Sequence, residues 1–259
     1  MSDMIINHMP GNVLYIENAF PKSKEFLLKL EEFENNELVR PIIPQWSFWE
    51  DGGPVRTDPN DPTKWVQFFD GSEDSHRGVS KNFDWDETLY EADPCWPRAV
   101  LDPSFSDAHS LAYEAISLIE HDYMKALDVW SKETENEIPK YITRNYCVRK
   151  YRAGGSMGKH VDKNVENPLN TMDWTALIYL NDDYKGGELS FPDLDYEISP
   201  SAGSVVFLPC LTRHGVREVQ SGNKFYIFLF IHTEYGTSTA LGESYHSLNG
   251  TIDRYKLLG

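Results

Sequence analysis

Residues 174–208 read WTALIYLNDDYKGGELSFPDLDYEISPSAGSVVFL. Short runs of apolar, β-branched and aromatic residues alternate here with Asn, Asp, Gly, Ser and Pro, which favour turns. Strands of this length, separated by turn residues, are typical of antiparallel β-proteins. The stretch therefore predicts four strands, at about 174–181, 187–191, 194–198 and 203–208.

The same pattern continues on both sides of this stretch. It predicts four further strands, at about 143–151, 158–162, 213–219 and 224–232. Eight short strands with turn residues between them suggest a jelly roll of two sheets, packed against the helices that precede it. The expected fold class is mainly β with flanking helices (α+β).

The first half of the chain is mixed. Residues 13–16 predict a short strand, and 50–62 (EDGGPVRTDPNDP) predict a surface loop because Gly, Pro and Asp are dense there. Apolar residues at helical spacing predict a long helix from Asp107 to about Trp130, with Ser106 or Asp107 as its N-cap. A second amphipathic helix is expected after Pro21, with four apolar residues on one face: Phe26, Leu27, Leu30 and Phe33.

We divide the chain into three parts of one integrated domain. Residues 1–140 form a mixed α/β region that packs on the core, 141–233 form the β core, and 234–259 form a C-terminal extension. The sequence leaves the oligomeric state open.

Charge narrows the range of partners. The 259 residues carry 24 basic and 41 acidic side chains, a net charge of −17. Such a surface repels phosphate backbones and anionic lipid head groups, so we expect neither nucleic acid nor a membrane as partner. The sequence predicts no membrane span and no signal peptide. Three widely separated cysteines without an export signal predict reduced thiols and a cytoplasmic location.

One segment of this acidic chain is basic. Residues 140–163 hold seven basic side chains and a single acidic one, Asp162. A basic stretch can be an ordinary solvated face, or it can attract a small anion to a site. The position of Asp162 inside it favours the second interpretation.

His160 and Asp162 lie two residues apart in a predicted strand, so their side chains point to the same face. His214, in another predicted strand, is the best third ligand. Two histidines and one carboxylate on one face of an octahedron leave three positions open, which suits non-haem iron. A lone His-x-Asp is weak evidence, and His160 by itself could be a histidine satisfied by hydrogen bonds.

Further elements accompany the pair in a fixed order and spacing. They are KYRAGGSMGKHVDK (150–163), IYLNDDYKGGELSFP (178–192), GSVVFLP (203–209) and TRHGVREVQSGNKF (212–225). Together they resemble the prolyl 4-hydroxylase-like branch of the Fe(II)/2-oxoglutarate-dependent dioxygenases, over roughly residues 141–233.

The resemblance implies a double-stranded β-helix core and a set of site residues. His160, Asp162 and His214 would hold iron(II), and Lys224 would pair with the distal carboxylate of 2-oxoglutarate. Lysine at this position is a feature shared with the collagen-type prolyl hydroxylases. Two tyrosines, Tyr151 and Tyr179, would donate hydroxyl groups to the co-substrate, although each alone is equally well a core aromatic.

The resemblance also implies the chemistry. We expect hydroxylation of a carbon with conversion of 2-oxoglutarate to succinate, dioxygen as second co-substrate, ascorbate as reductant, and no catalytic residue beyond the metal centre. The first expectation for the substrate is a prolyl residue of a peptide or protein. Arg144 and Trp174 flank the predicted cleft as substrate candidates.

Three other activities compete with this expectation. The same oxygenase chemistry could act on a free amino acid or another small molecule. A nucleic-acid demethylase would share the triad, but the charge of −17 opposes it. A jelly-roll binding module without catalysis would have no reason to keep the three ligands and the lysine in register.

Overall fold

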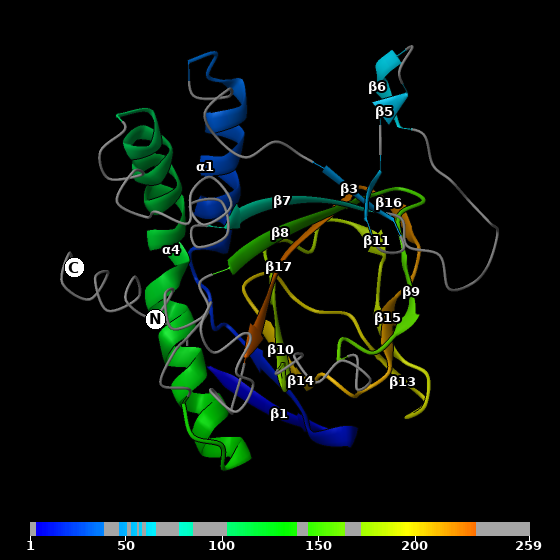
Figure 1. Cartoon of the computed structure of the whole chain (residues 1–259). Coiled ribbons are helices and arrows are strands. Elements are labelled where there is room, and N and C mark those ends of the chain that lie inside the picture. Colours follow the sequence, from blue (N-terminus) through cyan, green and yellow to red (C-terminus); the bar gives the residue numbers. More distant parts are fainter. Residues whose placement is uncertain are drawn as a thin grey trace, which may run out of the picture.

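The computed structural model describes residues 4–38, 103–138, 145–163 and 172–231, together with strand segments 47–50, 53–55, 57–58, 61–65 and 78–84 (Figure 1). Its core is a roll of two antiparallel sheets, so the predicted fold class is confirmed. The proposed boundaries at residues 140 and 233 stay predictions, and residues 232–259 lie outside the described part of the chain.

The larger sheet has nine strands in the order β1-β2-β14-β10-β17-β8-β7-β3-β4. Their bounds are β1 Ile5–Met9, β2 Val13–Glu17, β14 Val205–Pro209, β10 Trp174–Tyr179, β17 Asn223–Ile231, β8 Asn145–Arg152, β7 Gly78–Asp84, β3 Ser47–Glu50 and β4 Gly53–Val55. Strands from the first third of the chain thus extend the sheet at both edges.

The smaller sheet has four strands, in the order β13 (Tyr196–Ile198), β12 (Leu189–Phe191), β15 (His214–Val216) and β9 (Met157–His160). Two-stranded ribbons add β11 (Lys185–Gly186) with β16 (Val219–Ser221), and β5 (Thr57–Asp58) with β6 (Asp61–Trp65). The strand predicted at 213–219 is therefore two strands, β15 and β16, in different sheets.

Two helices cover the outer face of the larger sheet (Figure 1). Helix α1 (Ser23–Asn35) buries three of the predicted apolar residues, Phe26, Leu30 and Phe33, and packs against helix α4 (Pro103–Thr134). Helix α4 contributes five buried side chains to the same core: Ile119, Tyr123, Ala126, Leu127 and Trp130.

Strand β10 separates two hydrophobic cores. Trp174, Ala176 and Ile178 belong to the core under the helices, whereas Leu177 and Tyr179 belong to the core inside the roll. Successive side chains of a strand point to opposite faces, so odd-numbered residues of β10 line the interior of the roll.

Several sequence expectations need correction. The long helix begins at Pro103, not near Asp107, because proline is well suited to the first helical position. The loop expected at 50–62 contains strands β4 and β5 and the start of β6, which are too short to show a periodic pattern. Among the described residues, no helix is both long and apolar enough to span a membrane.

Candidate metal centre and co-substrate pocket

Three side chains that are distant in sequence meet inside the roll. His160 ends β9 and His214 begins β15, and the two residues are directly paired across these strands. His160 Nε2 lies 3.3 Å from Asp162 Oδ1, and His214 Nε2 lies 3.7 Å from Asp162 Oδ2. One potential ligand atom from each residue lies within 4.8 Å of the others, a spacing at which the three residues could hold one metal ion.

Backbone carbonyls orient both imidazole rings. His160 Nδ1 lies 2.8 Å from the carbonyl of Gly158, and His214 Nδ1 lies 2.9 Å from that of Thr212. Since a carbonyl only accepts hydrogen bonds, each Nδ1 carries the proton and the lone pair is on Nε2. This is the tautomer that a metal ligand needs, held by the kind of outer contact that orients ligating histidines.

Asp162 lies just beyond the end of β9, so contacts outside that strand position it. Its backbone N–H donates to the carbonyl of Cys210 across 2.9 Å. The hydroxyl of Thr175 donates to Asp162 Oδ2 across 2.5 Å and lies 3.3 Å from Cys210 Sγ. Cys210 is buried, and with Thr175 it connects the carboxylate to the larger sheet.

The electrostatics of the three residues suit a divalent cation. Burial alone would raise the pKa of Asp162, but His214 and His160 outweigh it and lower that pKa to about 2. Burial lowers the pKa of His214, whereas Asp162 overcomes burial and raises the pKa of His160. A charged carboxylate and a neutral His214 are the forms that coordinate metal.

Lys224 supplies a buried cation in the same interior. Its side chain is fully buried on β17, and Nζ donates a hydrogen bond to the carbonyl of Gly187. Nζ lies 5.0 Å from the ring centre of Tyr179, 5.7 Å from that of Tyr184 and 5.6 Å from that of Tyr226. Burial lowers the pKa of Lys224 to about 7. An ammonium in such a cage fits a carboxylate.

Tyr151 and Tyr179 are both buried beside this lysine. Tyr151 lies opposite Lys224 on β8, and its hydroxyl lies 3.1 Å from that of Tyr226. Burial raises the pKa of Tyr179 and of Tyr226 well above 10, so both keep their hydroxyl protons. The sequence analysis missed Tyr226, although its position two residues after Lys224 on one strand places the two on the same face.

Two loops hold Lys224 in place. Asn181 Nδ2 donates to the carbonyl of Asn223 across 2.7 Å, and Asn181 Oδ1 accepts from the backbone N–H of Phe225 across 2.8 Å. Asn181 thereby holds the backbone on both sides of Lys224. Gly187 has φ +71°, and a Cβ there would lie 3.2 Å from Lys224 Cδ, which is tighter than ordinary contact.

The remaining sequence candidates are the two proposed substrate contacts, Trp174 and Arg144. Trp174 is buried under the helices, 5.6 Å from Trp130 between ring centres, and points away from the metal centre. The structure therefore does not support Trp174 as a substrate contact. Arg144 lies outside the described residues.

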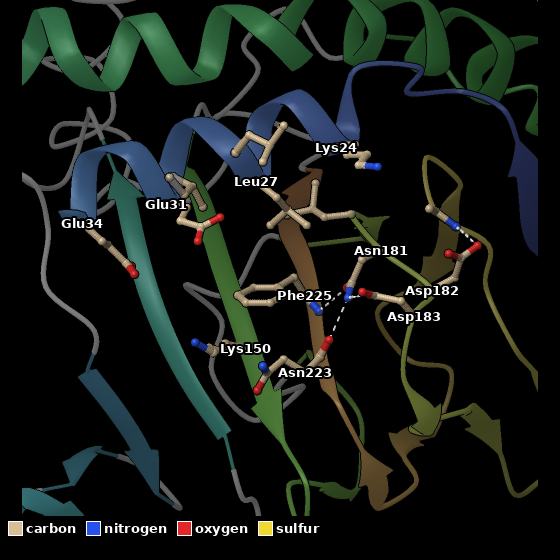
Figure 2. A pocket seen from close by; sticks show the side chains of 14 residues that line it. Lys24, Leu27, Glu31, Glu34, Lys150, Asn181, Asp182, Asp183, Asn223 and Phe225 are labelled. Atoms are coloured by element: carbon tan, nitrogen blue, oxygen red, sulfur yellow. Dashed lines mark hydrogen bonds between the residues drawn. The ribbon is translucent and has the colours of Figure 1, made fainter. Parts of the chain in front are cut away.

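A groove of about 530 Å³ lies on the outer face of the larger sheet (Figure 2). It runs between α1 and the start of β17, with Leu27, Lys150 and Phe225 among its lining residues. None of the three clustered ligand residues lines it. The groove is thus separate from the metal centre, on the other side of the sheet.

Comparison with known proteins agrees with this geometry. Residues 146–232, the segment with the three ligand residues and Lys224, match the model of the 2OG-Fe(II) oxygenase superfamily. Residues 146–232 form a 2OG-Fe(II) oxygenase domain. The oxygenase superfamily predicted from the sequence is thereby confirmed for this segment, and it implies iron(II), 2-oxoglutarate and dioxygen. The described residues of the domain fit these groups, with a triad for the metal and an ammonium for a carboxylate.

Individual relatives match the chain only in part. A PKHD-type hydroxylase of Stenotrophomonas maltophilia (strain R551-3) is 30% identical over 102 residues, covering 36% of this chain and 44% of the relative. One of Psychrobacter sp. (strain PRwf-1) is 28% identical over 148 residues, covering 53% and 52%. The match thus spans about half the length of these relatives. A Pseudomonas putida prolyl-4-hydroxylase structure aligns with TM-score 0.45 at 12% identity, covering 87% of this chain and 94% of that one.

Proposed function

We propose that the chain is an iron(II)- and 2-oxoglutarate-dependent hydroxylase whose substrate is a prolyl residue of a peptide or protein. One observation carries the oxygenase part: the triad of His160, Asp162 and His214 and the buried Lys224 face the same interior of the oxygenase domain. A binding module would not need both a metal triad and a buried cation, each costly to keep.

The residues have distinct roles in this proposal. His160, Asp162 and His214 hold iron(II) through Nε2 and carboxylate oxygens, and Thr175 keeps the carboxylate in place. When bound, iron(II) with 2-oxoglutarate and dioxygen supplies the oxidising chemistry that hydroxylates a carbon and yields succinate and carbon dioxide. The protein contributes geometry and a site from which water is excluded.

Lys224 anchors the far end of 2-oxoglutarate. A carboxylate that enters the pocket restores the charged form of an ammonium that burial otherwise disfavours. Tyr179 lies beside Lys224 and keeps its hydroxyl proton, and Tyr151 and Tyr226 line the same interior, with their hydroxyl oxygens 3.1 Å apart. These residues favour a ligand that carries a second carboxylate over a ligand whose far end is uncharged.

The substrate assignment rests on two observations. Lysine, rather than arginine, as the anchor is the feature that the sequence shares with collagen-type prolyl hydroxylases. In addition, the segments that carry the ligands hold two exposed apolar side chains: Val161 at 44%, between His160 and Asp162, and Leu211 at 57%, three residues before His214. Exposed apolar side chains in these segments favour an apolar substrate group such as a proline ring.

Turnover with a peptide library tests the proposal. The protein with iron(II), ascorbate and 2-oxoglutarate should form succinate, faster with proline-containing peptides, and mass spectrometry should show a gain of one oxygen on the peptide. Asp162→Ala should abolish both signals. Stimulation by free proline but by no peptide would favour the small-molecule oxygenase, and absence of succinate under all conditions would favour a binding module.

A cytoplasmic location is a further proposal. It is supported by the buried thiol of Cys210, which forms no disulfide, and by the wide spacing of the three cysteines. Expression of a tagged full-length chain followed by cell fractionation tests it.

A further inference from the structure

Arg149 is a basic residue on the interior face of β8. It pairs in register with Tyr226 on β17, and Tyr151, two residues along, lies on the same face. The guanidinium lies 4.4 Å from the ring centre of Phe228, and its Nη1 donates to Met157 Sδ across 3.4 Å. The side chain therefore reaches from the larger sheet to β9, the strand that ends at His160.

The side chain of Arg149 extends toward the metal centre. Along β17, Lys224, Tyr226, Phe228 and Phe230 share one face, and Phe230 pairs with Thr175, which contacts Asp162. The guanidinium of Arg149 lies over Phe228, between the level of Lys224 and the level of Thr175.

The spacing suits a short diacid. Lys224 lies opposite Tyr151, and Arg149 is two residues farther toward the metal end, which corresponds to roughly 7 Å along a strand. That is comparable to the span between the two carboxylates of an extended five-carbon diacid. A guanidinium is a charged donor, and it can pair with a carboxylate through two parallel hydrogen bonds.

We propose that Arg149 is a second carboxylate-binding residue, which holds the 2-oxo acid end of the co-substrate beside the metal while Lys224 holds the distal end. The inference rests on the proposed function, since it needs a 2-oxo diacid in the pocket. Arg149 would fix the orientation of the acid, because a guanidinium fork binds a carboxylate at a defined angle and an ammonium does not.

Two probe ligands distinguish the contact of Arg149 from the contact of Lys224. 2-Oxoglutarate carries both carboxylates, whereas 2-oxovalerate has the same chain length and lacks the distal one. Calorimetric titration of the manganese(II)-loaded protein, which does not turn over, should give an affinity for each probe. Arg149→Gln should weaken both probes about tenfold or more, because a hydrogen bond to a charged group is lost. Lys224→Met should weaken 2-oxoglutarate strongly and leave 2-oxovalerate nearly unchanged.

Neighbouring variants serve as controls. Lys150→Gln removes a charge from the next residue of the same strand, whose side chain lies over Phe225 on the outer face, and should change neither affinity. Arg149→Lys, which keeps the charge and loses the fork, should give an intermediate loss for both probes even if Arg149→Gln folds poorly. Unchanged affinity for both probes in both Arg149 variants would overturn the assignment. Unchanged 2-oxoglutarate affinity in Lys224→Met would instead contradict the proposed function.

Discussion

Thr175 and Asp162 are joined by a hydrogen bond of 2.5 Å that crosses from the larger sheet to the end of the smaller one. The side chain of Thr175 is buried inside the roll, and Cys210 Sγ lies 3.3 Å from its hydroxyl oxygen. The carboxylate therefore cannot rotate without breaking a buried contact. In this domain the ligand geometry is built by both sheets together.

Replacing Thr175 by Val, which has nearly the same shape, should weaken iron(II) binding about 10- to 100-fold, the usual effect of losing an outer partner of a metal ligand. Competition with a metal-binding dye measures this affinity. Thr175→Ser keeps the hydroxyl and should bind metal almost as the parent does. Equal affinity in the Val and parent proteins would show that the hydrogen bond has no role in metal binding.

Lys224→Met should make the protein more stable while it loses 2-oxoglutarate binding. Burial lowers the pKa of Lys224 from 10.5 to about 7, so the unfolded state binds its proton more tightly than the folded state. Wild-type stability from this group therefore rises with pH between about 7 and 10.5. The gain in Tm should be largest below pH 7 and shrink toward pH 10, at about 2–4 °C per kcal/mol for a chain of this size. Calorimetry at pH 6 and pH 9.5 checks the sign, and a larger gain at the higher pH would contradict it.

The affinity for 2-oxoglutarate should also depend on pH. The anchor must be protonated to pair with a carboxylate, and in the empty pocket its pKa is about 7. Affinity should be level below pH 7 and fall above it, approaching tenfold per unit because one proton is taken up on binding. Titration of the manganese(II)-loaded protein from pH 6 to pH 9 measures the slope. Lys224→Arg, which stays charged, should give a flatter profile even if it binds more weakly.

Gly187→Ala should impair the co-substrate pocket. The new methyl group would lie 3.0 Å from Val219 Cγ2 and 3.2 Å from Lys224 Cδ, at a backbone φ of +71°. We expect weaker 2-oxoglutarate binding and a loss of about 1–3 kcal/mol in the free energy of unfolding. Gly154→Ala is the matched control, since Gly154 has φ +85° but no atom within 4 Å of the added Cβ. It should share the backbone strain and bind 2-oxoglutarate normally; equal binding in both variants would show that crowding at Lys224 is harmless.

Much of the roll could be predicted because its strands are short and separated by turn residues. The pairing of His160 with His214 was not visible, since periodicity gives the faces of one strand and not its neighbours. The link from Asp162 through Thr175 to Cys210 joins three distant segments, so no local pattern contains it.

Trp174 shows that the sequence also failed to predict which face of a strand points into the roll. The sequence interpretation placed Trp174 at the flank of the predicted cleft, yet its neighbour Thr175 is the residue that contacts the metal ligand Asp162. A one-residue difference in register reverses the face of every side chain in a strand. Tyr226 and Arg149 were overlooked for the same reason, because they line the pocket only if their faces of β17 and β8 point inward.

The division of β10 into two faces has a consequence for how such proteins diverge. Trp174, Ala176 and Ile178 belong to the core that the helices cover, while Leu177 and Tyr179 belong to the core inside the roll and Thr175 contacts Asp162. Helices can therefore be exchanged, shortened or redesigned on the outside as long as the backbone of this strand stays in place. A grafting experiment would keep residues 146–232 and replace the helical layer with one from another protein. The new helices would pack on the outer face of the larger sheet, where the native helices pack.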